Sequence, residues 1–314
     1  MLTYLTRRLS MMLLTLSLVA VTVFVLIRLV PGDSATLMLG EAGSPEQLAV
    51  LRARWGLDQP WPIQFLYWVK GMLTGDFGIS TRTGEPVLPL ILARFQVSAV
   101  IVLTAMVIAV LIAVPVGLYA AWKQNSWADL AVVSVATLLL SIPSFWLGLL
   151  LLVIFGLKLG WLPILGYVGF GEDFSRATSF VILPVATLAL IEIGVLVRMA
   201  RASAIEVLRL EYVTHARAKG LPEWRVLAFH VFPNAFAPTL TLIGLILGNL
   251  LGGIAVLETV FTLPGMGRLL VESIFARDYP VVQGCLLLTG VIFVLINLFV
   301  DMLYPIFDPR VARA

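Results

Sequence analysis

The sequence predicts an all-α membrane protein that crosses the bilayer six times. Of its 314 residues, 60% are hydrophobic and only 12% are charged, whereas ordinary globular chains carry about 25% charged residues. The apolar residues are grouped in blocks of about 20, the helix length that spans the ~30 Å hydrocarbon core of a bilayer. The six blocks lie at about residues 9–30, 97–121, 130–157, 180–197, 237–257 and 281–304.

The first block follows two arginines, Arg7 and Arg8, and with them makes residues 1–30 an N-terminal tail and first span. A cleaved signal peptide shares this basic start and apolar run. However, the run exceeds the 7–15 residues of a signal h-region, and no A-x-A-like cleavage site follows it. We therefore expect a retained span, with the side chain of Arg28 extending to the interface near its far end.

Residues 31–95 are expected to form a large external segment that does not cross the membrane. Residues 44–47 read Ser-Pro-Glu-Gln, a capping box with proline at the first helical position. Leu48, Leu51 and Trp55 then fall on one helical face. A second, aromatic-rich helix is expected at residues 63–72, and both helices are typical of the membrane surface.

The third block contains a polar Ser-Ile-Pro-Ser sequence near its middle. Proline removes a backbone hydrogen bond and permits a kink, so Ser141, Pro143 and Ser144 are candidates for a bend that lines a pore. An alternative is that the serine hydroxyls serve only to bond the carbonyls that Pro143 frees.

Ionisable and amide side chains inside the later blocks are further pore or gating candidates. Glu192 lies in the fourth block, where an ionisable residue is a functional candidate by default, but it could simply pair with nearby Arg198. Asn297 and Asp301 lie at i and i+4 on one face of the sixth block. Asn249 is a candidate in the fifth block, with hydrogen bonding between helices as its alternative role.

The fifth block carries a glycine strip. Gly244, Gly248 and Gly252 repeat at four-residue spacing, which places them on one helical face and lets another helix approach closely. This strip predicts helix packing and carries no information on a substrate.

A polar, basic stretch at residues 211–238 separates the fourth and fifth blocks. Its first half is expected to be a helix that ends at Gly220 as the C′ residue. Arg217 and Lys219 would lie in the last turn, where the helix dipole favours cations. Pro222 then suits the first turn of a second short helix.

This stretch resembles the EAA-type coupling loop of ABC importer permeases, which would span residues 199–236 here. The Ala-Arg-Ala-Lys-Gly-Leu string is similar to the dipeptide, oligopeptide and nickel branch of that family. The Glu-Ala-Ala triplet departs from the pattern, because it falls on Thr-His-Ala and only the last alanine matches. The resemblance places these residues in the loop: Glu211, Ala216, Arg217, Ala218, Lys219, Gly220, Leu221, Pro222 and Pro233.

Three strings in the external loop at residues 258–280 strongly resemble the same family, and in the family's order. They read Glu-Thr-Val-Phe, Leu-Pro-Gly-Met-Gly and Arg-Asp-Tyr-Pro, and they carry Glu258, Pro264, Gly265, Gly267, Arg277 and Asp278. Shorter strings at residues 30–33, 55–60 and 75–78 resemble the first permease subunit, which has a large external segment after its first span. Whether this segment contacts the substrate or serves only as a cap stays open.

The resemblance implies the type I ABC importer fold: six transmembrane helices, a cytoplasmic coupling helix, a permease core at residues 96–305 and a cytoplasmic tail at 306–314. The implied partners are a paralogous permease subunit, one or two P-loop ATPases and an external solute-binding protein. The implied function is import of di- or oligopeptides by alternating access. Nickel or its chelate, glutathione, and an opine or sugar conjugate stay open as substrates.

Charge indicates the orientation. With both termini inside, the short cytoplasmic segments hold most of the arginines and lysines, as the positive-inside rule requires. Together with this orientation, the resemblance implies a multi-pass protein of a bacterial inner membrane, surrounded by lipid. A net charge of +3, spread over loops, gives no support for nucleic-acid binding.

The sequence excludes a P-loop, because none of its lysines precedes serine or threonine; these are Lys70, Lys123, Lys158 and Lys219. No catalytic or metal motif is visible, and the single cysteine, Cys285, is read as a packing residue. We expect no cofactor on this chain, with ATP and magnesium on partner subunits. An ion-coupled secondary transporter is the alternative of another class, but only Glu192 and Asp301 could serve as its ion relay.

Overall fold

The computed structural model describes residues 2–29, 44–54 and 56–307, and it is almost entirely helical. One isolated bridge, between Ile79 and Pro86, is the extended pairing in those ranges. The helices are α1 (Leu2–Leu29), α3 (Pro45–Arg54), α4 (Trp61–Thr74), α5 (Val87–Trp122), α6 (Trp127–Ser141), α7 (Ser144–Leu151), the π-helix η2 (Leu152–Lys158), α8 (Phe174–Leu208), α9 (Glu211–Ala218), α10 (Glu223–Arg225), the π-helix η3 (Val226–Val231), α11 (Phe232–Gly253), α12 (Ala255–Val260), α13 (Met266–Phe275) and α14 (Tyr279–Phe307).

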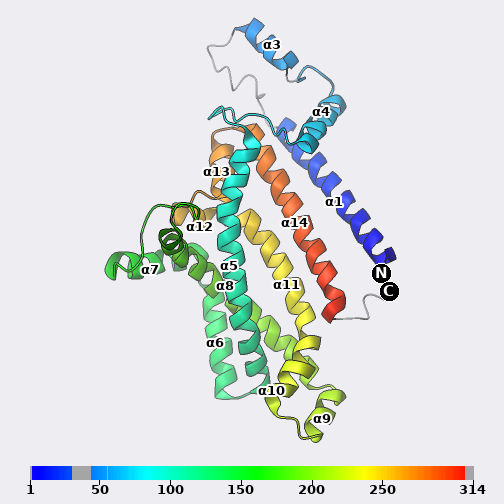
Figure 1. Ribbon diagram of the computed structural model, residues 1–314, viewed down its shortest axis with the longest axis vertical. Coiled ribbons are helices and arrows are strands. Elements are labelled where there is room, and N and C mark those ends of the chain that lie inside the picture. Colours follow the sequence, from blue (N-terminus) through cyan, green and yellow to red (C-terminus); the bar gives the residue numbers. More distant parts are fainter. Residues whose placement is uncertain (1, 30–43, 55, 308–314) are drawn as a thin grey trace.

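Long helices set the axis of the molecule. Figure 1 shows α5, α8, α11 and α14 running along the longest dimension, with α9 and α10 at one end and α3 and α4 at the other. We call these the α9 end and the α4 end. Helix α5 packs mainly on α8, and α14 lies between α11 and α1. The main apolar core, which includes Ile101, Leu188 and Leu257, lies where α5, α8 and α12 meet.

Among the described residues, five helical segments are long and apolar enough to cross a membrane. They are Thr6–Leu29, Val87–Trp122, Phe174–Leu208, Glu223–Gly252 and Tyr279–Phe307. A bent pair, α6 followed by α7 and η2, supplies the sixth apolar block. The predicted all-α, six-block architecture is therefore confirmed, although one block is not a straight span.

The third block is bent at Pro143, as its Ser-Ile-Pro-Ser sequence predicted, and the bend is sharp. Helix α6 ends at Ser141, and the chain turns by 98° before α7 begins. Ile142 and Pro143 are both extended, with ψ of 123° and 137°, because the residue before a proline is driven out of the helical region. The serine hydroxyl of Ser141 bonds to the Thr137 carbonyl, at 2.9 Å, and not to the Leu139 carbonyl that Pro143 leaves free.

The fourth and fifth blocks also have different bounds from those predicted. Helix α8 has 35 residues and continues to Leu208, so the predicted loop at 199–236 begins inside a helix. Its N-terminus is capped by Asp173, which accepts from the Arg176 amide at 3.0 Å. Pro233 lies in the first turn of α11. A break at Ile254 ends α11, and the loop predicted from residue 258 begins inside helix α12, which contains Glu258.

The external segment contains both predicted helices. The capping box is confirmed, because the Gln47 amide donates to Ser44 Oγ at 3.2 Å and the Ser44 amide donates to Gln47 Oε1 at 3.1 Å. Trp55, the Leu51 side chain, the string at 30–33 and the end of the tail lie outside the described residues.

The glycine strip of α11 lies against α14. A Cβ atom on Gly244 would come within 2.7 Å of Val300, and one on Gly248 within 2.3 Å of the Phe293 ring. Since real Cβ atoms do not approach so closely, these glycines allow α11 and α14 to pack at short distance.

Candidate functional site

The α9 end is built around a helix that stops sharply at Gly220. This glycine has φ of +78° and follows Lys219 as the C′ residue, as predicted. The Gly220 amide donates to the Arg217 carbonyl at 2.9 Å, and the Leu221 amide donates to the Ala216 carbonyl at 3.4 Å. This pair of bonds is a Schellman motif, whose left-handed residue favours glycine. The space around Gly220 is open, so its backbone conformation alone requires glycine.

Helix α9 is attached to the bundle by one apolar face. Val213 and Ala216 are buried against Val226 and Val231 of η3, in a cluster that includes Ala204 of α8. The cluster holds α9 and η3 together as one unit at the end of α8.

The opposite face of α9 is exposed. Six of the residues that the family resemblance placed in the coupling loop lie on this face or just after it: Glu211, Arg217, Ala218, Lys219, Gly220 and Pro222. Arg217 spans the turn to α10, with its Nε atom 2.8 Å from Glu223 Oε1. The Tyr212 hydroxyl donates to the His230 carbonyl at 3.1 Å, and partial burial raises the pKa of this phenol. The unit therefore presents a polar, basic face on α9 beside exposed aromatic side chains of α10 and η3, Trp224 and Phe229.

A buried ion pair ties α6 to α8 near the α9 end, and the sequence analysis did not identify it. Arg201 meets Asp129 through two bonds, Nε to Oδ1 at 2.5 Å and Nη2 to Oδ2 at 2.7 Å. The same carboxylate accepts from the Asn125 amide at 2.9 Å. Such two-pronged pairing of a planar guanidinium fixes geometry as well as charge. Arg198, in contrast, is exposed, and the predicted alternative of a pair with buried Glu192 is wrong.

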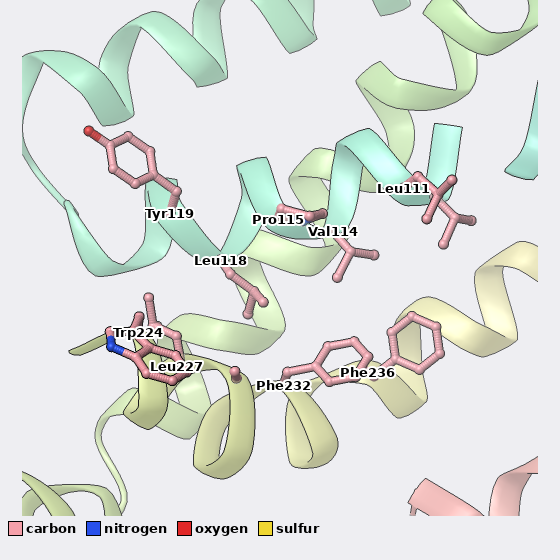
Figure 2. A pocket seen from close by; sticks show the side chains of 11 residues that line it. Leu111, Val114, Pro115, Leu118, Tyr119, Trp224, Leu227, Phe232 and Phe236 are labelled. Carbon is pink, nitrogen blue, oxygen red and sulfur yellow. The ribbon is translucent and has the colours of Figure 1, made fainter. Parts of the chain in front are cut away.

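An apolar groove of about 500 Å³ separates α5 from the α10–η3 segment. Figure 2 shows Leu118 and Pro115 of α5 facing Leu227 and Phe232 across it. Beside the groove, η3 packs on α9, α8 and α11, and Ala121 and Leu118 near the end of α5 join the same apolar cluster.

The other candidate pore residues are dispersed. Asn249 is exposed on α11. Asn297 donates to the Phe293 carbonyl of its own helix at 2.8 Å. Asp301 lies 2.7 Å from Arg8, which joins the last helix to the first. The structure therefore does not bring these side chains together with Ser141 or Glu192 into one cluster.

At the opposite side of the bundle, Glu258 organises the first part of the 258–280 loop. Its buried carboxylate accepts from Ser98 Oγ of α5 at 2.6 Å and from the Arg268 amide at 2.7 Å. A Cβ atom on Gly265 would lie 2.0 Å from this carboxyl group, and one on Gly267 would lie 2.9 Å from the Ala255 backbone. The two glycines are thus needed for the loop to fold over the carboxylate. Burial raises the pKa of Glu258, although these hydrogen bonds oppose the rise.

Asp278 fixes the end of the same loop. It is buried and accepts from Ser80 Oγ at 2.5 Å and from the Thr81 amide at 3.1 Å. Ser80 and Thr81 belong to the external segment before α5. Arg277, the preceding residue, has a positive φ of 55°, and Pro264 lies in the turn before α13. Glu258 and Asp278, which belong to the strings that resemble the permease family, therefore attach the loop to α5 at one end and to the external segment at the other.

Comparison with known proteins identifies this architecture. A family model described as "binding-protein-dependent transport system inner membrane component" matches residues 113–313. A companion model for the N-terminal part of such membrane components matches residues 1–104. The chain belongs to this permease family.

Curated relatives cover the permease almost completely. A putative peptide transport system permease of Brucella suis biovar 1 (strain 1330) is 42% identical over 305 residues, 97% of each chain. The dipeptide transport system permease DppB of Alkalihalophilus pseudofirmus is 39% identical over 331 residues, 99% of each chain. The glutathione transport system permease GsiC of Salmonella choleraesuis is 41% identical over 311 residues, also 99% of each.

A solved structure shares the fold. It is titled as inward-facing conformations of the MetNI methionine ABC transporter, and it matches with a TM-score of 0.59 at 16% identity. The match covers 71% of the permease and 99% of the MetNI chain. At this identity the similarity establishes the fold alone. Together these findings make the protein a multi-pass inner-membrane permease component.

Proposed function

We propose that this permease imports di- or oligopeptides, which an external binding protein delivers and separate ATPase subunits drive. Relatives named as peptide and dipeptide permeases, 42% and 39% identical over nearly the whole chain, support this substrate class. Glutathione, itself a peptide, is the second candidate because a glutathione permease is 41% identical.

The unit formed by α9, α10 and η3 is the proposed contact with an ATPase. The observation that carries this assignment is the exposed face of α9, held rigidly by the Schellman turn at Gly220 and by the buried Val213 and Ala216. The α9 end would then lie in the cytoplasm. Both termini follow it there, because Arg8 of α1 and Asp301 of α14 pair near the chain ends.

Transport would follow from a shift between two arrangements of the bundle. ATPase closure displaces the α9 unit, and the helix that runs without interruption from Glu223 to Gly252 moves with it. The groove between α5 and η3 provides room for this displacement. A partner can move such an equilibrium only by binding the two arrangements unequally, so the polar surface of α9 must fit the closed ATPases best. The permease chain itself breaks no bond.

Cysteine cross-linking tests the contact. In a Cys285→Ser background, Ala218→Cys lies on the exposed face of α9, and Glu172→Cys serves as a matched exposed control in the external loop. A short bifunctional thiol reagent should join the Ala218→Cys variant, and not the control, to a co-expressed ATPase carrying a cysteine in its permease-binding cleft. Cross-linking of the control alone would assign the ATPase to the other end.

Substrate import needs a separate test. The complex is reconstituted in proteoliposomes with its binding protein, and uptake of a labelled dipeptide and of labelled glutathione is followed with and without ATP inside the compartment that faces α9. Uptake of either that requires ATP supports import. Uptake that persists without ATP and follows a proton gradient would make the secondary transporter the better reading.

A further inference from the structure

A polar pocket of about 360 Å³ lies at the α4 end, where the end of α1, helix α4, the turn after α4 and the start of α14 meet. It lies at the opposite end of the bundle from α9 and apart from the Glu258 network, and its lining residues Ile79 and Pro280 adjoin the bond between Ser80 and Asp278. Its wall includes Arg28, Gln64, Trp68, Asp76 and Gln283.

Three buried polar atoms in this wall have no hydrogen-bond partner among the described residues: Gln64 Oε1, Trp68 Nε1 and Gln283 Nε2. The side chains of Gln64 and Gln283 are each only 8% exposed. The amide nitrogen of Gln64 is used, since it donates to the Leu57 and Gln59 carbonyls at 3.1 and 2.7 Å. A buried polar atom without a partner costs about 1–3 kcal/mol. Three such atoms in the wall of one pocket indicate a ligand that would bond to them once their side chains turn into it.

Charges of both signs complete the wall. The Arg28 guanidinium lies 5.0 Å from the centre of the Phe24 ring and contributes positive charge. Asp76 contributes a carboxylate, one of whose oxygens accepts from the Gly78 amide at 2.9 Å. The pocket thus offers a cation and two N–H donors for an anionic group, and a carboxylate and an amide oxygen for a cationic one.

Local structure holds these groups in place. Phe24 of α1 packs edge-on against Phe65 and close to Trp68, with ring centres 5.3 and 5.8 Å apart, so α4 is fixed to α1. Helix α4 ends at Gly75, which has φ of +82°, and the Asp76 amide donates to the Gly71 carbonyl at 2.8 Å. A Cβ on Gly71 would meet the Asp76 carbonyl at 2.9 Å, so this tight turn sets where the Asp76 carboxylate lies.

We propose that this pocket binds a zwitterion, a small group that carries an oxyanion and an ammonium. The oxyanion accepts from Trp68 Nε1 and Gln283 Nε2 beside the charge of Arg28. The ammonium donates to Asp76 and to Gln64 Oε1. Two sources present this chemistry: a short peptide in solution, for which the proposal rests on the proposed peptide import, and the headgroup of an ethanolamine phospholipid.

Direct binding measurements on the whole complex test the pocket and separate the two sources. In nanodiscs of phosphatidylcholine alone, equilibrium dialysis measures the affinity for labelled alanyl-alanine. In parallel, native mass spectrometry of the complex titrated with phosphatidylethanolamine counts retained lipid. Two variants alter the pocket. Trp68→Phe removes the indole donor, and Gln283→Glu replaces a donor with a carboxylate. Trp161→Phe and Gln124→Glu are matched changes at exposed positions outside it.

We expect saturable binding of one probe, weakened about tenfold or more by each pocket variant, as loss of a bond to a charged group predicts, and unchanged by the control variants. The probe that responds identifies the source. The proposal is overturned if neither probe binds, or if both pocket variants bind as tightly as the parent. Trp68→Phe keeps an aromatic ring at this position and keeps the test valid where Gln283→Glu fails to assemble. ATP-driven uptake, measured separately, reports on the import proposal independently of this pocket.

Discussion

Arg201 and Asp129 face each other across the α6–α8 interface with both guanidinium bonds made, at 2.5 and 2.7 Å. Asp129 is almost fully buried, and its partner is 72 residues away in the sequence. The pair therefore joins the first turn of α6 to the part of α8 that leads into α9. Loss of Asp129 leaves the Arg201 guanidinium, whose side chain is 24% exposed, without its counter-ion.

Asp129→Asn is expected to destabilise the complex by on the order of 3 kcal/mol, because it leaves the Arg201 charge without its counter-ion. Thermal unfolding of the detergent-solubilised complex measures this. The exposed pair Arg217–Glu223 supplies the control, since Glu223→Gln should cost less than about 1 kcal/mol. Equal losses in the two variants would contradict a special role for the buried pair.

Gly220→Val is expected to cost about 1–2 kcal/mol in the α9 turn, since a β-branched residue does not adopt a φ of +78° readily. We expect the variant to insert normally and to lose most ATP-driven uptake. Gly220→Asn is the control, because asparagine tolerates the left-handed region. Normal uptake by Gly220→Val, with membrane levels equal to the parent, would remove the coupling assignment.

Gly248→Leu should disrupt the contact between α11 and α14, because even a Cβ there would lie 2.3 Å from Phe293. Overpacking of this kind costs about 1–3 kcal/mol. Gly171→Ala, a loop glycine with no atom within 4 Å of an added Cβ, should behave as the parent. The measurement is the midpoint of thermal aggregation for each purified complex.

Asp301→Asn should leave ATP-driven uptake within about twofold of the parent, because its partly exposed pair with Arg8 is of the kind worth less than about 1 kcal/mol. Glu192→Gln should likewise keep ATP dependence. A proton-coupled transporter would need one of these carboxyl groups, so abolished uptake in either variant, with ATPase activity intact, would favour that mechanism.

Stability should depend on pH through Glu258. Its folded-state pKa is raised by burial, so its protonated form is favoured in the folded protein. Its contribution to the free energy of unfolding is greatest below the ordinary carboxyl pKa and is lost as pH rises through the raised value. The unfolding midpoint of the parent should therefore rise relative to that of Glu258→Gln as pH falls from about 8 to about 5. A parent midpoint that falls relative to the variant on acidification would contradict this, because it would mean that the folded protein favours the ionised carboxylate.

Local sequence rules predicted much of this structure. The capping box at Ser44, the left-handed Gly220 and the glycine strip on α11 are each determined by a few neighbouring residues, and periodicity identified the apolar blocks. The Ser-x-x-Asp pattern that starts at Ser126 could also have marked Asp129 as a helix-capping residue. Its pairing with Arg201 could not be read, because it depends on how α6 and α8 pack.

The misplaced boundaries have the same origin. Hydropathy ended the fourth block at about residue 197, but α8 continues because its later residues are good helix formers and Ala200 packs against Gly117 of α5. Pro143 signalled a bend, whereas its 98° angle depends on the surrounding helices. Likewise, the role of Glu258 as the centre of a hydrogen-bond network became visible only when Ser98 of α5 was placed beside it.

The helical segment from Glu223 to Gly252 connects the α9 end to the glycine strip through α10, the π-helix η3 and α11. Its 30 residues extend over about 45 Å at about 1.5 Å per residue. Helix α14 contacts it at both ends of α11, through Val300 and Phe293 at the strip and through the ring of Phe307 near η3. A displacement that begins at α10 would therefore move α11 and α14 as one pair, and the close glycine contacts would carry it along the bundle without opening a gap between the two helices.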